Sequence, residues 1–220
     1  MNFRALIYLL TLIILMSFTT YKKSFEGIIT YKTEIRFKKK NVLYREYFEQ
    51  KFGDTLKVYY NENGDIFKQY FNTGESGYDF NLYQASNNHY YAKWKNLDTI
   101  YHYNVSEQTL DFVNKTTGRS EKILGKECDY IQIEGFEPNG KQTVIQKYSY
   151  SGFPYLDPEL FENFTDFYTN DLIKKAKSPF MKMELDLGDY VVTYTAINIE
   201  PKKLNAKIFQ LPNDIPKKEY

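Results

Sequence analysis

Short runs in which apolar and polar side chains alternate constrain the fold of this chain more than any other feature. In residues 25–37, successive side chains would point to opposite sides of an extended strand, which gathers the apolar ones on one face and the charged ones on the other. The apolar face consists of Phe25, Ile29, Tyr31, Ile35 and Phe37. This alternation predicts a strand with one buried face.

Similar runs rich in tyrosine and phenylalanine recur along the chain, with turn-forming residues between them. All seven prolines lie at or after Pro138, so no proline before that residue interrupts a ladder of backbone hydrogen bonds. We therefore expect an antiparallel meander of hairpins. The further expected strands are residues 42–52, 56–60, 66–71, 78–83, 89–94, 99–105, 109–113, 128–133, 143–150, 181–187, 190–199 and 206–211.

One segment has the periodicity of an amphipathic helix. Asp157 is a suitable N-cap, Pro158 suits the first helical position, and Pro179 ends the segment. Its apolar stripe consists of Leu160, Phe161, Phe164, Phe167, Tyr168 and Leu172. The sequence thus predicts a mainly β protein with one principal α-helix, residues 157–177, packed against the apolar face of a curved antiparallel sheet.

The N-terminal segment is typical of a secretory signal peptide. Arg4 precedes an apolar run over residues 5–16, and small polar residues follow. The alternative is a transmembrane anchor, which needs about 17–25 apolar residues, more than this run provides. We expect a signal peptide at 1–20, a single β-rich domain at 21–212 and a polar tail at 213–220. No cysteine directly follows the apolar run, so the predicted location is the periplasm or cell envelope without a lipid anchor.

The composition argues against several classes of function. Lysine plus arginine number 29 and aspartate plus glutamate 28, a balance unlike that of a nucleic-acid-binding protein. One cysteine, Cys128, and two histidines, His89 and His102, leave little material for a disulfide framework, a metal site or a catalytic triad. The sequence therefore predicts no catalytic residues, no metal and no cofactor. Cys128 is interpreted as a buried side chain, with an intermolecular disulfide as the alternative.

Three short segments carry a resemblance to a known group of proteins. They are residues 25–31 (FEGIITY), 123–130 (ILGKECDY) and 209–212 (FQLP). With the signal peptide, they resemble small exported Bacteroidota proteins of unknown function, the GLPGLI type and its relatives, which are distantly similar to the LolA/LolB-like lipoprotein carriers. The resemblance implies a half-barrel, a bent antiparallel sheet whose concave side is closed by helix and, in the carriers, shelters acyl chains. It implies no catalytic residues.

The excess of aromatic residues has two interpretations. The rings could line a ligand groove, because tyrosine combines an apolar ring with a polar tip. Alternatively they pack on a pleated sheet surface, where such residues are generally favoured. The residues predicted to bind a ligand are Tyr59, Tyr91, Trp94, Tyr101, Leu160, Phe164 and Tyr168.

Three functional hypotheses remain. The first is a non-enzymatic envelope protein that binds a lipid or an acylated protein between sheet and helix. The second is a structural module with a filled core, whose edge strands pair with an envelope protein partner. The third is a carbohydrate-binding protein or an enzyme. A continuous apolar cavity would favour the first hypothesis over the second.

Overall fold

The structure is a computed structural model that describes residues 22–40, 45–136 and 142–220. Its strands are β1 (Gly27–Phe37), β2 (Thr55–Tyr60), β3 (Ile66–Phe71), β4 (Tyr78–Gln84), β5 (His89–Trp94), β6 (Ile100–Asn104), β7 (Asp111–Arg119), β8 (Asp129–Phe136), β9 (Thr143–Tyr150), β10 (Lys182–Asp186), β11 (Tyr190–Pro201) and β12 (Lys217–Glu219). The helical segments are α2 (Arg45–Phe52), α3 (Thr169–Ala176) and the 3₁₀ helices η1 (Pro158–Phe161), η2 (Asp166–Tyr168) and η3 (Ala206–Phe209). The prediction of a mainly β protein is confirmed.

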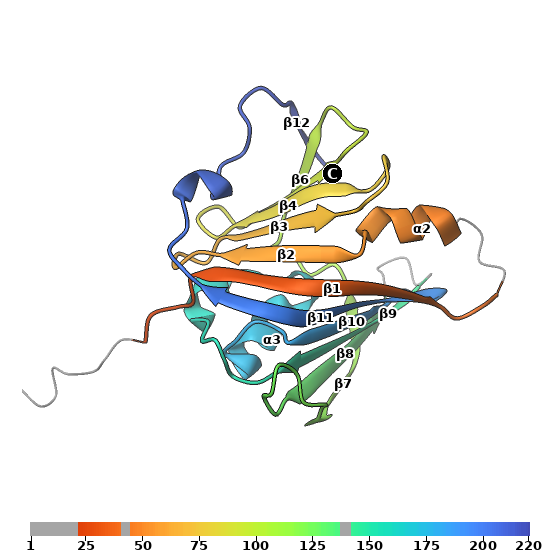
Figure 1. Ribbon diagram of the computed structural model, residues 1–220, viewed down its shortest axis with the longest axis vertical. Coiled ribbons are helices and arrows are strands. Elements are labelled where there is room, and N and C mark those ends of the chain that lie inside the picture. The colour runs from red at the N-terminus through yellow and green to blue at the C-terminus, as the bar shows by residue number, and fades with distance from the viewer. Residues whose placement is uncertain (1–21, 41–44, 137–141) are drawn as a thin grey trace, which may run out of the picture.

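All twelve strands belong to one open sheet, in the order β12-β6-β5-β4-β3-β2-β1-β11-β10-β9-β8-β7 (Figure 1). Strands β1 to β6 form one meander, strands β7 to β11 form another, and the pairing of β1 with β11 joins the two. Neighbouring strands are antiparallel throughout, except that β12 runs parallel to β6. The predicted antiparallel hairpins are therefore confirmed.

The connection between β6 and β7 requires the sheet to curve. These two strands are ten positions apart in the strand order, which in a flat sheet would separate them by roughly 48 Å at about 4.8 Å per strand. Residues 105–110, which join them, can reach at most about 25 Å. The sheet therefore bends towards the face that this connection crosses, and we call that face concave.

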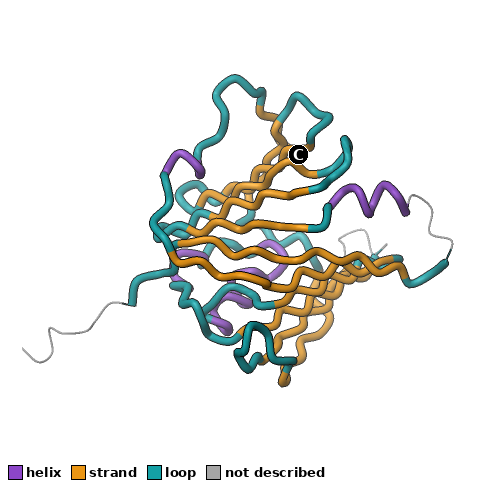
Figure 2. The backbone as a smooth tube through the Cα atoms, viewed as in Figure 1, coloured by secondary structure: helices purple, strands orange, loops and turns teal. Residues whose placement is uncertain are grey.

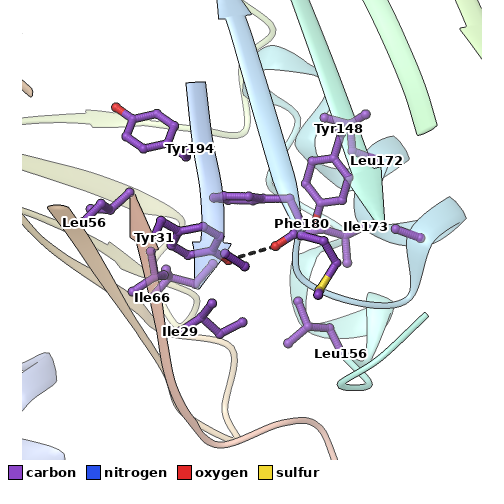
Figure 3. Packing of buried hydrophobic residues seen from close by; sticks show 14 of the residues in the cluster. Ile29, Tyr31, Leu56, Ile66, Tyr148, Leu156, Leu172, Ile173, Phe180 and Tyr194 are labelled. Atoms are coloured by element: carbon purple, nitrogen blue, oxygen red, sulfur yellow. Dashed lines mark hydrogen bonds between the residues drawn. The ribbon is translucent and has the colours of Figure 1, made fainter. Parts of the chain in front are cut away.

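The hydrophobic core lies on the concave face. Ile29 and Tyr31 of β1 are fully buried, whereas Lys32 and Glu34 point to the opposite face and are exposed. Helix α3 contributes Leu172 and Ile173 to the same cluster, close to Phe180 (Figure 3). Figure 2 shows the helical segments near α3 behind the central strands in that view. The alternation read from the sequence thus separates core from surface.

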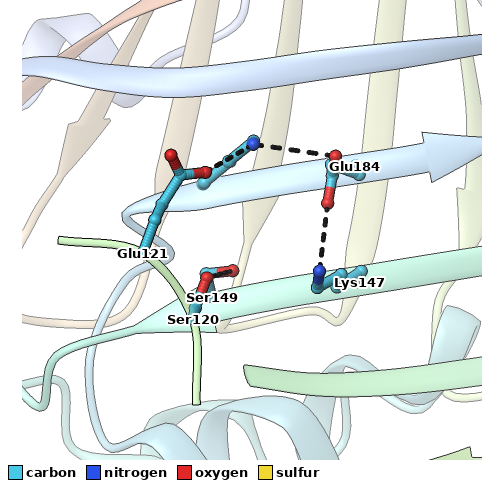
Figure 4. Close-up of polar contacts among 6 residues, drawn as sticks. Ser120, Glu121, Lys147, Ser149 and Glu184 are labelled. Carbon is cyan, nitrogen blue, oxygen red and sulfur yellow. Dashed lines mark hydrogen bonds and ion pairs between the residues drawn. The ribbon is translucent and has the colours of Figure 1, made fainter. Parts of the chain in front are cut away.

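The opposite, convex face carries ion pairs between neighbouring strands. Lys147 on β9 lies opposite Glu184 on β10, with Nζ 3.6 Å from a carboxylate oxygen (Figure 4). Lys182 contacts Glu184 at 3.7 Å and Glu121 at 2.6 Å. Such partly exposed pairs contribute little to stability, but they mark this part of the convex face as a polar surface.

Residues 42–52 were expected to form a strand, and this expectation is wrong for the residues that the structure describes. Arg45–Phe52 form α2, while residues 41–44 lie outside the described part of the chain. The helix is supported by pairs four residues apart: Arg45 with Glu49, and Gln50 with Glu46. Phe48 and Phe52 share its apolar side and stack near Tyr190, at ring distances of 4.3 and 6.5 Å.

The continuous helix expected at residues 157–177 is also wrong. Asp157 does cap a helical turn, because its carboxylate accepts a hydrogen bond from the Glu159 amide at 3.1 Å, but that turn is the short η1. The chain then breaks at Phe167 and Tyr168, whose φ angles of 52° and 55° are left-handed. The break follows from tertiary contacts. The amides of residues 165 and 166 bond to the Val105 carbonyl in the β6–β7 connection instead of to a preceding helical turn.

The C-terminal region differs from expectation at two points. Residues 206–211 were expected to be a strand, but they contain η3, where the Asn205 side chain accepts a hydrogen bond from the Lys207 amide and Phe209 is buried. Within the expected polar tail, Lys217–Glu219 form β12 and pair with β6, although their side chains are exposed. Because the side chains of β12 form no apolar face, its sequence shows no alternation of apolar and polar residues that would predict a strand.

The expected signal peptide, residues 1–20, lies outside the described residues. Within the described part of the chain, no helix is both long and apolar enough to cross a bilayer.

Candidate functional site

A cavity of about 440 Å³ lies between the concave face and the chain segment that contains η1, η2 and α3. Its volume falls within the range of small-molecule sites, about 300–1,000 Å³. Most lining side chains are aromatic or aliphatic, and ten of them are tyrosines: Tyr60, Tyr70, Tyr78, Tyr83, Tyr90, Tyr101, Tyr103, Tyr148, Tyr194 and Tyr220.

The strand register arranges the sheet wall of the cavity in rows that run across the strands. We call these the outer rows and the middle row. One outer row is Tyr60, Ile66, Tyr83, Tyr90 and Tyr103. The other outer row is Leu56, Tyr70, Tyr78 and Trp94. The middle row is Lys68, Asn81, Ala92 and Tyr101. Both outer rows are largely aromatic, and the middle row holds polar side chains and a small one.

The opposite wall comes from residues 156–180. Phe164 is buried, with its ring centre 4.4 Å from that of Tyr83. Two tyrosine hydroxyls tie this segment to the sheet: Tyr31 donates to the Phe180 carbonyl at 2.9 Å (Figure 3), and Tyr148 donates to the Ser178 carbonyl at 2.8 Å. Both bonds are buried, and burial strongly raises the pKa of Tyr31 and of Tyr148. The hydroxyls therefore stay protonated and remain donors.

Asp166 is the one carboxylate among the residues that line the cavity. The Tyr103 hydroxyl donates to it at 3.0 Å, and the Thr109 hydroxyl and the Phe167 amide donate as well. Burial raises the pKa of Asp166, an effect that these hydrogen bonds partly offset. Three donors occupy this side chain, so its arrangement indicates that it holds residues 165–168 against β6.

Lys68 stands in the middle row without an acidic partner in the described residues. Its ammonium lies 5.6 Å from the centre of the Tyr90 ring. The side chain is half-buried, and it lines the cavity. Burial lowers the pKa of Lys68 to about 8, because an apolar surrounding disfavours the charged form. Asn81, directly opposite on β4, is buried and also faces the cavity.

Lys51 and Tyr220 mark the mouth of the cavity. The Lys51 ammonium lies 5.3 Å from the centre of the Tyr78 ring, and burial lowers its pKa. Tyr220 is 87% exposed, and its ring centre lies 6.1 Å from that of Tyr101. Because an exposed residue lines the cavity here, the cavity is open to solvent at this end.

The residues predicted to bind a ligand occupy different places. Trp94, Tyr101 and Phe164 line the cavity. Tyr59 and Tyr91 lie on the convex face, where Tyr59 bonds to Gln69 and Tyr91 packs in a smaller cluster with Phe209.

Leu160 and Tyr168 pack against the main core without lining the cavity. The Tyr168 hydroxyl donates to the Leu110 carbonyl at 3.0 Å. Lys68 and Asn81 also line the cavity, and the sequence did not single them out. Alternation within a strand shows which residues share a face with Lys68 on β3, or with Ala92 on β5. Only the pairing of the strands shows that Lys68 and Ala92 lie in the same row.

The histidines and the cysteine lie away from the cavity. His89 and His102 are on the convex face, with ring centres 5.5 Å apart. In the described part of the chain, no group of three or more histidine, cysteine, aspartate or glutamate side chains is arranged to hold a metal ion. Cys128 is buried, and burial raises its pKa, which disfavours the reactive thiolate.

Comparisons with known proteins give little further information. No family model matches the chain, and no curated protein matches it either. Among solved structures, it is similar to the Mycobacterium tuberculosis lipoprotein LppX, with 10% sequence identity and a TM-score of 0.36; the match covers 82% of this chain and 89% of that one. The resemblance to exported Bacteroidota proteins stays a prediction.

Proposed function

We propose that this protein binds an apolar ligand, a lipid or the acyl chain of an acylated protein, in the cavity between the curved sheet and residues 156–180. The observation that carries this proposal is the cavity itself, about 440 Å³ with a largely apolar lining and an opening at Tyr220. A structural module with a filled core would not retain such a space, since protein interiors normally leave few voids larger than a water molecule. Binding at this site requires no chemical step.

We further propose that the protein works outside the cytoplasm, in the periplasm or cell envelope. The support is the signal-peptide pattern of residues 1–20, which the sequence alone provides. Lipids and acylated proteins are available in that compartment, and a carrier there needs a shielded apolar space.

Two measurements test apolar binding. The first is organic extraction of protein purified from its native envelope, followed by mass spectrometry. The second is titration of the delipidated protein with a fluorescent fatty acid. We expect a co-purifying lipid and saturable binding. Absence of both would contradict the proposal and favour the structural module.

A cavity-filling variant makes the test specific. Ala92 is the smallest side chain on the sheet wall, and Ala92→Phe places a ring in the middle row. We expect it to weaken binding of the fluorescent fatty acid at least tenfold. The matched control is Asn198→Phe, which adds the same ring at an exposed position of β11. Equal binding by both variants, with unchanged circular dichroism, would show that the ligand lies elsewhere.

A further inference from the structure

The cavity has a polar site within its apolar wall. Lys68 and Asn81 are directly paired across β3 and β4, and they lie between two largely aromatic rows. Directly opposite residues in a sheet have Cβ atoms about 5 Å apart, so an ammonium and an amide point into the same part of the cavity. Ala92, the next residue in the row, leaves space above the sheet beside them.

The ammonium of Lys68 has no internal counterion in the described residues. On the convex face, by contrast, Lys147 and Lys182 are both paired with acidic side chains. The one carboxylate of the cavity lining, Asp166, already accepts hydrogen bonds from Tyr103, Thr109 and a backbone amide. A charge in a half-buried and largely apolar site is costly unless it is paired, so an anion bound beside Lys68 would offset this cost.

We propose that the cavity takes a single-chain amphiphile with an anionic head, a carboxylate or a phosphate monoester, and that the Lys68 ammonium and the Asn81 amide bind this head. The inference rests on the proposed function, because it assumes that the cavity is a ligand site. Lys51 at the mouth adds a second positive charge and favours entry of an anion over a cation.

The remaining lining suits the hydrocarbon part of such a ligand. The outer rows and the residues Phe164, Leu172 and Ile173 present ring and aliphatic surfaces. A volume of about 440 Å³ holds roughly fifteen groups of the size of a water molecule, at about 30 Å³ each. A methylene group is of similar size, so the cavity fits one acyl chain of medium length.

The test compares three probes that share a twelve-carbon chain: dodecanoate, dodecyl phosphate and the uncharged dodecanol. Their affinities for the delipidated protein are measured at pH 7 by calorimetry, for the wild type, Lys68→Met and the control Lys57→Met. Lys57 is a half-buried lysine on the convex side of β2. Of the two anions, we expect the one with the higher affinity to bind the wild type at least tenfold more tightly than dodecanol does.

Lys68→Met should abolish that preference and leave dodecanol binding unchanged, which also shows that the variant is folded. Lys57→Met should behave as the wild type. The relative affinities of the two anions identify the head that the site prefers. Equal binding of anion and alcohol by the wild type, or an unchanged preference in Lys68→Met, overturns the inference but leaves apolar binding intact. Failure of all three probes to bind overturns the proposed function as well.

Discussion

Lys68 and Lys147 show how one residue type differs between the two faces of this sheet. Lys147 lies on the convex face opposite Glu184, where water and a carboxylate stabilise its charge. Lys68 faces the cavity, where burial lowers its pKa to about 8. The two residues look alike in the sequence, because each stands in a run of alternating side chains. Only the direction in which the sheet curves separates them.

Replacing Lys68 should therefore raise the free energy of unfolding of the ligand-free protein. We expect Lys68→Met to raise the free energy of unfolding by about 1 kcal/mol at pH 7, the usual size of such a gain when a residue kept for function is replaced. The pKa of Lys68 is about 8 when folded, below its ordinary 10.5, so the unfolded chain binds more protons between these pH values. Wild-type stability then rises with pH across that window relative to the variant.

Urea denaturation at pH 7 and at pH 10.5 checks this. The difference in free energy of unfolding between Lys68→Met and the wild type should be largest below about pH 8, the pKa of folded Lys68. It should nearly vanish at pH 10.5. A wild type that is the more stable protein at pH 7, or a difference independent of pH, would show that the lysine is not buried as a charge.

At the scale of elements, the segment 157–177 shows local signals giving way to tertiary contacts. The N-cap at Asp157 and the apolar spacing are real, and they produce η1 and α3. The chain nevertheless turns left-handed at Phe167 and Tyr168, where bonds to Val105 and the side chain of Asp166 anchor it to β6 and to the β6–β7 connection. Helical periodicity cannot reveal such an anchor, since the partners are about sixty residues away in sequence.

The end of α3 offers a test of its geometry. Lys177 follows the helix with a φ of 49°, donates its amide to the Ile173 carbonyl at 2.7 Å, and is exposed. Glycine adopts this conformation without strain, so Lys177→Gly should stabilise the protein by about 0.5–1 kcal/mol. Lys174→Gly, inside the same helix, should destabilise it by up to about 1 kcal/mol. Thermal or urea unfolding of both variants measures the contrast, and two effects of the same sign would contradict this ending of the helix.

At the scale of the whole molecule, the covering segment links the two meanders. Tyr31 lies on β1 and Tyr148 on β9, and their hydroxyls donate to two carbonyls of the same short stretch, those of Phe180 and Ser178. These two bonds therefore tie the same stretch to a strand of each meander. Met181 connects this stretch to β10, and its amide donates to the Ser149 carbonyl of β9 at 2.7 Å.

Removing either hydroxyl should weaken this link. We expect Tyr31→Phe and Tyr148→Phe each to lower the free energy of unfolding by about 1–2 kcal/mol, because a buried carbonyl loses its donor. Tyr59→Phe on the convex face, where the hydroxyl lies 3.2 Å from Gln69, should change it by less than about 0.5 kcal/mol. Chemical denaturation of the three variants provides the measurement. Indistinguishable midpoints would mean that packing alone holds the segment.

Strands β1 to β11, the order of their hairpins and the buried side of β1 follow from the sequence, because alternation and turn residues act over a few positions. The sequence also indicated an apolar cover near Phe164 and aromatic side chains around Trp94 and Tyr101. It could not tell which of two adjacent tyrosines, Tyr90 or Tyr91, faces the cavity, since both faces of β5 bury apolar residues.

Long-range contacts set the position of the cavity. Curvature follows from the short link between β6 and β7, and pairing of distant strands sets Lys68 beside Asn81 and Ala92. Other long-range contacts interrupt the expected helix, through the bonds of residues 165 and 166 to Val105, and pair β12 with β6 next to the cavity-lining Tyr220. The cavity is lined by residues that come together only when distant parts of the chain pack, and no local sequence pattern predicts which residues these are.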